Sequence, residues 1–195
     1  IRATLEEITP YHTPSFTIQL DSNIPIAAGL GSGAAVTVAI IRALSAFLGE
    51  PLPNQRISEL AYEIEKIHHG TPSGIDNTVV TYQKPVYFQR GEPLQTLTPT
   101  QPTYWVIADT GEKTPTREMV AGVRDLYENA PDTYEAIFAE IGQIARDARQ
   151  ALTQGDLNQL GPLMNRNQLL LKDLQVSSPR LERLIIAARE AGAVG

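Results

Sequence analysis

The chain has 195 residues, 42% of them hydrophobic, and its 16 basic and 22 acidic side chains give a net charge of −6. That apolar content suffices for a buried core and excludes a wholly disordered chain. No cluster of Lys and Arg is present to track a nucleic-acid backbone, so we expect no nucleic-acid partner. The sequence has no cysteine, and no apolar run reaches the roughly 18 residues of a membrane span. We therefore expect a cytoplasmic protein that does not enter a membrane.

The first part of the chain predicts a strand, a glycine-rich loop and a buried helix in succession. Residues 16–20 alternate in polarity and are rich in residues that favour strands. The nearly uncharged sequence 33–48 predicts a helix that ends at Gly49 and Pro51. The order of these elements places the glycines at a helix N-terminus.

A second helix is expected to begin at Ser58 as its N-cap and to end at Gly70. Its apolar stripe contains Leu60, Ile64 and Ile67. This helix leads into a loop with the sequence TPSGIDN.

Two strands are predicted next, over residues 78–82 and 86–89, as a hairpin. The Pro- and Thr-rich sequence 92–103 then favours a domain boundary, which gives domains 1–95 and 96–195. The second domain is expected to contain one strand and four helices, over 104–108, 116–129, 134–154, 156–174 and 179–191.

Three glycines, Gly29, Gly31 and Gly33, favour an anion site at the start of the first long helix. Glycine permits positive φ and close approach of a ligand, and the free N–H groups of a helix N-terminus attract phosphate. The alternative is a tight strand-to-helix turn in which glycine only relieves steric crowding. A Walker A loop is excluded because Ala34 and Ala35 replace its Lys and Ser/Thr, and no acidic second strand supports a dinucleotide fold.

Two carboxylates, Glu65 and Asp76, flank the loop after the second helix. A chain reversal there would bring them together, so that one holds Mg²⁺ while the other accepts a proton. An exposed helix residue and an Asx turn are the alternatives for Glu65 and Asp76, respectively. His68 and His69 point in different directions and have no evident third ligand, which disfavours a histidine metal site.

Three segments resemble the GHMP kinases and, among them, the mevalonate kinases: PIAAGLGSGAA at 25–35, EKIHHGTPSGIDN at 65–77 and VIADTGEKTPTREMVAGVR at 106–124. The resemblance implies an α+β fold with two lobes, the first like ribosomal protein S5 domain 2 and the second ferredoxin-like. It also implies ATP-dependent phosphorylation of the primary alcohol of mevalonate, and often a homodimer.

The same resemblance implies a role for individual residues. Asp76 corresponds to the catalytic residue that activates the substrate hydroxyl, and Glu65 and Ser32 to Mg²⁺ ligands. The substrate-side positions are His69, Pro72, Ser73 and Thr116. ATP phosphates are expected over Gly29, Leu30, Gly31, Ser32, Gly33 and Ala34.

The chain departs from the family pattern in two ways. Gly33 stands where the family usually has a serine that ligates Mg²⁺. The family's N-terminal lysine motif and C-terminal glycine-rich motif are not matched, so we expect a piece of a longer protein. The alternatives to mevalonate phosphorylation are another GHMP kinase acting on a sugar, homoserine or mevalonate derivative, a nucleotide-binding module without turnover, and a purely structural domain.

Overall fold

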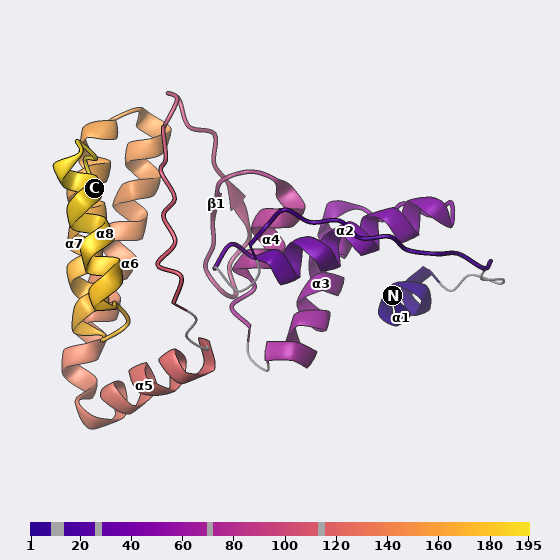
Figure 1. The fold of residues 1–195 in the computed structure, drawn as a ribbon, viewed down its shortest axis with the longest axis horizontal. Helices are drawn as coiled ribbons and strands as arrows, with labels where there is room; N and C mark the ends of the chain where they lie inside the picture. The colour runs from indigo at the N-terminus through magenta and orange to yellow at the C-terminus, as the bar shows by residue number, and fades with distance from the viewer. Residues whose placement is uncertain (9–13, 26–28, 70–71, 113–115) are drawn as a thin grey trace. The chain divides into compact units, whose positions relative to one another are not determined.

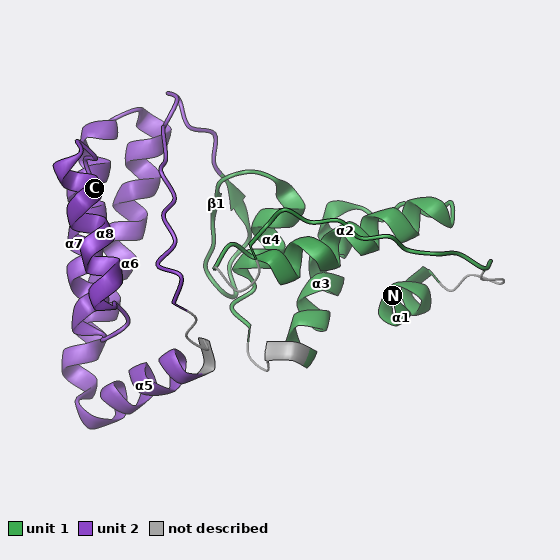
Figure 2. Cartoon of the chain, viewed as in Figure 1, with its two compact units in different colours: residues 1–96 green, residues 97–195 purple. Residues whose placement is uncertain are grey.

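The computed structural model describes residues 1–8, 14–25, 29–69, 72–112 and 116–195. Contacts between these residues group the chain into two compact units, 1–96 and 97–195 (Figure 2). The lobe bounds expected from the sequence, 1–95 and 96–195, stay a prediction. Each unit is described by itself below.

The first unit is mainly helical, with one small sheet. Its two strands, β1 (Val86–Tyr87) and β2 (Gln95–Thr96), pair in antiparallel fashion, with Val86 opposite Thr96. Its helices are α1 (Arg2–Ile8), α2 (Ser32–Phe47), α3 (Asn54–His69) and α4 (Ile75–Tyr82).

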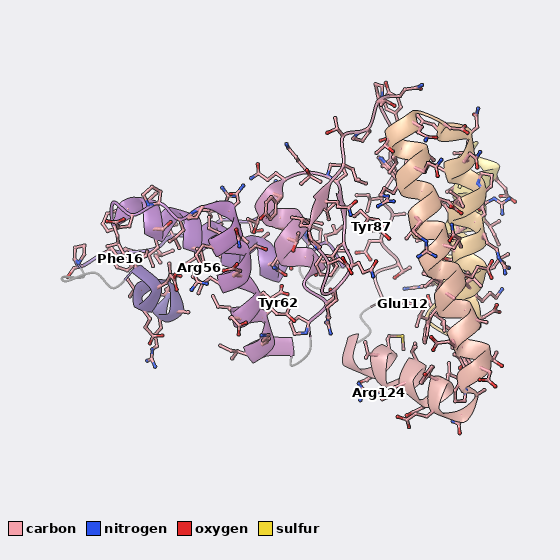
Figure 3. The ribbon with its side chains drawn as sticks, turned by 180° about the vertical axis from the view of Figure 1, so that it is seen from behind. Phe16, Arg56, Tyr62, Tyr87, Glu112 and Arg124 are labelled. Atoms are coloured by element: carbon pink, nitrogen blue, oxygen red, sulfur yellow. The ribbon has the colours of Figure 1, made fainter. Side chains whose placement is uncertain are left out.

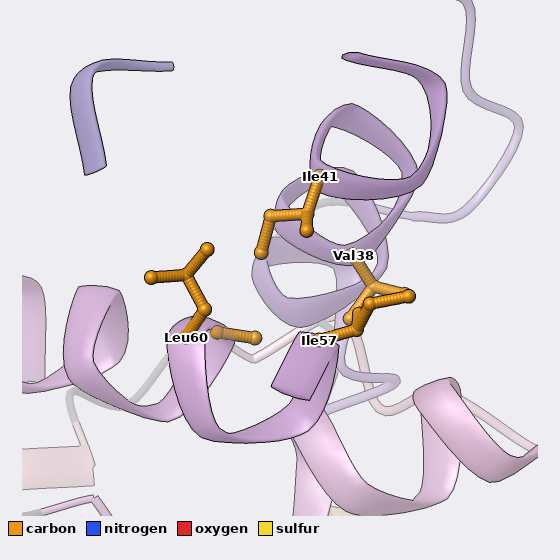
Figure 4. Close-up of a cluster of buried hydrophobic side chains, with 5 residues drawn as sticks. Val38, Ile41, Ile57 and Leu60 are labelled. Atoms are coloured by element: carbon orange, nitrogen blue, oxygen red, sulfur yellow. The ribbon is translucent and has the colours of Figure 1, made fainter. Parts of the chain in front are cut away.

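The core of this unit forms where α2 packs against α3. Its buried side chains are Val38 and Ile41 from α2, and Ile57, Leu60 and Ala61 from α3 (Figure 4). α2 contacts α1, α3 and α4, but its buried residues, Ala34, Val38, Ile41, Leu44 and Ser45, recur at helical spacing on one face, so the expectation of a helix buried on most sides was wrong. The predicted helix over 33–48 is confirmed, within one residue at each end.

The predicted start of the second helix was wrong. α3 begins at Asn54, where Pro53 supplies the carbonyl that accepts from the Ile57 N–H, and Ser58 lies in the second turn. Ser58 is buried because α4 packs over it, so its hydroxyl is not available as a cap. Ile67, assigned to the apolar stripe, is 78% exposed.

Two of the strand predictions in this unit were also wrong. Residues 16–20 are extended but belong to no strand, and the ring of Phe16 packs edge-on against Phe47 at 5.8 Å between centroids. The segment 78–82 lies in α4, although it is rich in β-branched residues. There, packing against α2 and α3 outweighs local strand propensity. β1 pairs with β2 instead, which leaves only the second half of the predicted hairpin as a strand.

The second unit has the four helices that the sequence predicts, with one additional turn. Its buried side chains include Ala151, Leu160, Leu170 and Leu174. Figure 1 shows α6, α7 and α8 running alongside one another. The elements are α5 (Thr116–Asn129), α6 (Pro131–Gln154), the 3₁₀ turn η1 (Leu157–Gln159), α7 (Leu160–Asp173) and α8 (Pro179–Glu190).

Residues 104–108, predicted as a strand, are extended but belong to no strand in the part of the chain that the structure describes. The segment is held at its two ends instead: the Thr100 N–H donates to the Leu152 carbonyl, and Arg180 Nη1 donates to the Thr110 carbonyl. Between these points Tyr104 is 96% exposed and Val106 92%. Helices and a small sheet together confirm the α+β class. Among the described residues no helix is long and apolar enough to cross a membrane.

Candidate active site

The N-terminus of α2 is an open backbone site. Gly29 and Gly31 have φ values of +73° and +65°, in the left-handed region that favours glycine. Gly31 is the N-cap and accepts the first helical hydrogen bond from Ala35, while no side chain caps the helix. Nothing lies within 4 Å of a Cβ built on Gly33. The first N–H groups of α2 therefore have no side-chain cap, and uncapped N–H groups at a helix start fit an anion.

The other residues expected in this loop differ in exposure. Leu30 is exposed, and Ser32 is the first residue of α2. Ala34 is 2% exposed, so its methyl group belongs to the packed side of the helix. Any contact between Ala34 and a ligand would have to come from its backbone.

The structure brings Asp76 to this helix N-terminus. Asp76 lies in the first turn of α4, and its Cβ and Cγ are 3.8 Å from the position that a Cβ on Gly31 would occupy. The glycine loop and the carboxylate are 45 residues apart in sequence. They nevertheless meet in the folded chain, which places an exposed acid beside an uncapped helix start.

A glycine and two aromatic rings fix where α4 begins. Gly74 is its N-cap, with φ +89°, and Thr78 Oγ1 donates to the Gly74 carbonyl at 2.7 Å. A Cβ at Gly74 would lie 3.3 Å from the ring of Tyr62 and 3.4 Å from that of Phe88. Glycine is needed here both for the backbone conformation and for the close approach of the rings.

The loop before α4 is held by contacts that sequence reasoning missed. Arg90 Nη2 donates to the Pro72 carbonyl at 2.7 Å, and the Ile75 N–H donates to Ser73 Oγ at 3.3 Å. Asn77 is the second missed residue, and its side chain binds α3. No sequence signal identifies Arg90. Asn77 has a weak one, because it is a polar residue directly after the predicted catalytic carboxylate Asp76.

A shallow groove of about 280 Å³ lies between α3, α4 and the turn that follows β1. Gly74, Asn77 and Thr78 line it from α4, and Tyr62 lines it from α3 (labelled in Figure 3). Because helical residues are about 100° apart, Asp76 faces away from the side of α4 that carries these three residues. The groove is therefore separate from the contact between Asp76 and Gly31.

The two predicted metal ligands lie on different helices, Ser32 on α2 and Glu65 on α3. Glu65 lies near the end of α3 and is half-buried. Among the described residues no group of three or more His, Cys, Asp or Glu side chains could hold a metal ion. His69 ends α3 and Thr116 begins α5, but the side chains of both lie outside the described residues.

Known protein families match both ends of the chain. The model for the GHMP kinases N-terminal domain matches residues 1–84, and the model for the GHMP kinases C-terminal domain matches residues 148–195. Together they account for more than half of the chain.

Individual relatives are similar over nearly the whole chain. The mevalonate kinase of Thermococcus onnurineus is 40% identical over 92% of this chain and 54% of that protein, and that of Aeropyrum pernix is 37% identical over 95% and 57%. This chain thus spans about half the length of the curated relatives it matches.

Solved structures agree with the sequence matches. The crystal structure of L. major mevalonate kinase in complex with R-mevalonate superposes with a TM-score of 0.79 at 33% identity, over 85% of this chain and 52% of that one. The Methanococcus jannaschii mevalonate kinase gives a TM-score of 0.78 at 25% identity, over 97% and 59%. From the two domain matches and these relatives, we conclude that the chain belongs to the GHMP kinase family.

Proposed function

We propose that this chain forms part of a kinase that transfers the γ-phosphoryl group of ATP to the primary alcohol of mevalonate. The observation that carries the proposal is the position of Asp76 against Gly31, at the uncapped N-terminus of α2. This arrangement offers an anion site and a proton acceptor side by side. The names of the relatives support mevalonate as the substrate, since the matched proteins are mevalonate kinases.

The chain's own residues account for the main steps. The first N–H groups of α2 and the glycine backbone from Gly29 to Gly33 bind the ATP phosphates. Asp76 accepts a hydrogen bond from the substrate hydroxyl and takes its proton as the alcohol oxygen bonds to the γ-phosphorus. The bond from that phosphorus to the bridging oxygen breaks, and ADP leaves. Catalysis of this kind consists mainly of positioning and charge stabilisation.

The expected metal ligands fit Mg²⁺ in chemistry, because both supply oxygen atoms. Glu65 offers a carboxylate, and Ser32 offers the hydroxyl that Gly33 lacks. Mg²⁺ held there would neutralise negative charge on the transferred phosphates. Pro72, Ser73, His69 and Thr116 are proposed on the substrate side. A homodimer and a cytoplasmic location stay predictions.

The first test is ATP-dependent phosphorylation of mevalonate in the presence of Mg²⁺, measured with this chain and with the full product of its gene. Asp76→Asn should lower kcat by about 100-fold or more, because a positioned general base contributes at least that much. ATP binding, measured by calorimetry, should persist. Asp125→Asn, the same change on the exposed side of α5, should leave kcat unchanged.

Other results identify the alternatives. Phosphorylation of a sugar, homoserine or a mevalonate derivative in place of mevalonate would indicate a different GHMP kinase. ATP binding with no turnover on any of these substrates would indicate a nucleotide-binding module. If the full gene product neither binds ATP nor phosphorylates any of these substrates, the kinase assignment is contradicted.

A further inference from the structure

Asn77, the neighbour of Asp76 in the first turn of α4, is anchored on α3. Its Nδ2 donates to the backbone oxygen of Ser58 and to Ser58 Oγ, at 3.0 Å in each case. Because a carbonyl oxygen can only accept, the amide nitrogen must be the atom that faces α3. Asn77 is 3% exposed, so these bonds are shielded from water. The side chain ties the start of α4 to the second turn of α3.

This tie determines the direction of Asp76. Consecutive residues of a helix are about 100° apart, so α4 cannot rotate about its axis without breaking the bonds to Ser58. With those bonds in place, Asp76 lies against Gly31, at 3.8 Å from the Cβ position of that glycine. The hydrogen bonds of Asn77 on one side of α4 thus fix the direction of the Asp76 carboxylate on another side.

The second polar atom of Asn77 argues against a purely stabilising role. Asn77 Oδ1 is buried and accepts no hydrogen bond within the described residues. Burying a polar atom without a partner costs free energy that an apolar side chain of similar size would not incur. We therefore attribute the presence of an amide at position 77 to the directed hydrogen bonds that its N–H groups donate.

We propose that Asn77 is a positioning residue for phosphoryl transfer, whose amide, anchored on Ser58, sets the direction in which Asp76 presents its carboxylate. The inference rests on the proposed function, in which Asp76 accepts the proton of the substrate hydroxyl. Asn77 itself is 3% exposed and bonded to α3, so we assign it no contact with either substrate. Its loss should consequently reduce kcat and leave the binding of ATP and mevalonate nearly intact.

The test compares Asn77→Leu with Thr81→Val in the full gene product. Leucine has the same branched arrangement of side-chain heavy atoms as asparagine, with a larger volume, and removes both N–H groups. Thr81 lies on the same helix at 1% exposure, and its hydroxyl has no partner among the described residues, so Thr81→Val is a matched control. Asn77→Leu should lower kcat by about 10- to 100-fold, the effect of a displacement of about 1 Å. KM for both substrates should stay within about twofold, and Thr81→Val should keep the wild-type kcat.

A double variant distinguishes positioning from general destabilisation. If Asn77 acts through Asp76, then Asn77→Leu causes no further loss of kcat in an Asp76→Asn background. Wild-type kcat in Asn77→Leu would overturn the inference and leave the proposed function standing. Equal losses in Asn77→Leu and Thr81→Val would overturn it as well.

A measurement without turnover covers the case in which mevalonate is not phosphorylated at all. In ¹H–¹⁵N NMR spectra, the backbone amide signal of Gly31, which is distant from residue 77 in sequence, should shift in Asn77→Leu and stay in place in Thr81→Val. An unchanged Gly31 signal in Asn77→Leu would contradict the inference whatever the substrate is. Absent turnover combined with a shifted Gly31 signal would instead reject only the proposed function.

Discussion

Gly31 is restricted by its backbone conformation. Its φ of +65° lies in the region that L-residues with a Cβ rarely adopt, while a Cβ there would lie at an ordinary contact distance of 3.8 Å from the side chain of Asp76. Gly33, two residues later, has no positive φ and no atom within 4 Å of its Cβ position. The two glycines should therefore respond differently to the same substitution.

We expect Gly31→Ala to lower the free energy of unfolding by about 1–2 kcal/mol, the cost of a left-handed conformation. It should also weaken ATP binding. Gly33→Ala should raise the free energy of unfolding by up to about 1 kcal/mol, because alanine is favoured inside a helix. Urea denaturation and calorimetry with ATP measure both effects. Equal stability of the two variants would show that the backbone at Gly31 is not restrictive.

At this scale the sequence predicts some site residues and not others. The glycine loop and Asp76 lie in short segments with recognisable residue types, so both are predictable. Asn77 and Arg90 act through partners 19 and 18 residues away, Ser58 and Pro72. Contacts of that separation depend on how helices pack and leave no local pattern in the sequence.

Helix α1 is attached to α3 by a charged pair. Arg56, which Figure 3 labels on α3, donates from Nε and Nη2 to the two carboxylate oxygens of Glu7, at 2.5 and 2.6 Å. The same guanidinium donates to Glu59 at 2.8 Å. Hydrogen bonds from Arg56 lower the pKa of Glu7 and of Glu59 below the usual 4.5. The pair is exposed, so its contribution is screened by salt.

The lowered pKa of Glu7 predicts an acid-dependent loss of stability. The folded state favours the ionised carboxylate, so the stabilisation is complete above pH 4.5 and is lost as the pH falls through the lower, folded-state pKa. Glu7→Gln should therefore melt below the wild type at neutral pH and match it in acid. Thermal midpoints from about pH 7 to about pH 3 measure this. A difference that persists unchanged in acid would contradict it.

Helices were easier to predict than strands, for a physical reason. α2 and α5 to α8 have local signals such as apolar periodicity, Gly49 after α2 and Ser178 as N-cap of α8. A strand requires a partner that the local sequence does not specify. Residues 16–20 and 104–108 have strand-like composition but no partner strand among the described residues.

The molecule as a whole consists of two units with separate cores. The buried cluster that contains Ile41 lies in the first unit, and the second unit has buried apolar side chains of its own, among them Leu170. A domain with its own core can fold independently. The core residues of each unit could not be predicted from the sequence, because they depend on how the helices pack.

We expect the fragments 1–96 and 97–195 to fold when they are produced separately. Each should unfold cooperatively, and their circular dichroism spectra should sum to that of the whole chain. Division between residues 50 and 51 is the control, because it separates α2 from α3 and divides their shared core. Loss of structure in either 1–96 or 97–195 would contradict the expectation.

The extended segment around Tyr104 and Val106 has a practical consequence. Its apolar side chains face water, and its backbone pairs with no strand in the described part of the chain. An extended segment with an unpaired backbone resembles the edge of a sheet. Natural proteins protect sheet edges with lysine or proline, because unprotected edges template aggregation. A lysine at position 106 is accordingly the first change to make when the protein is concentrated for crystallisation.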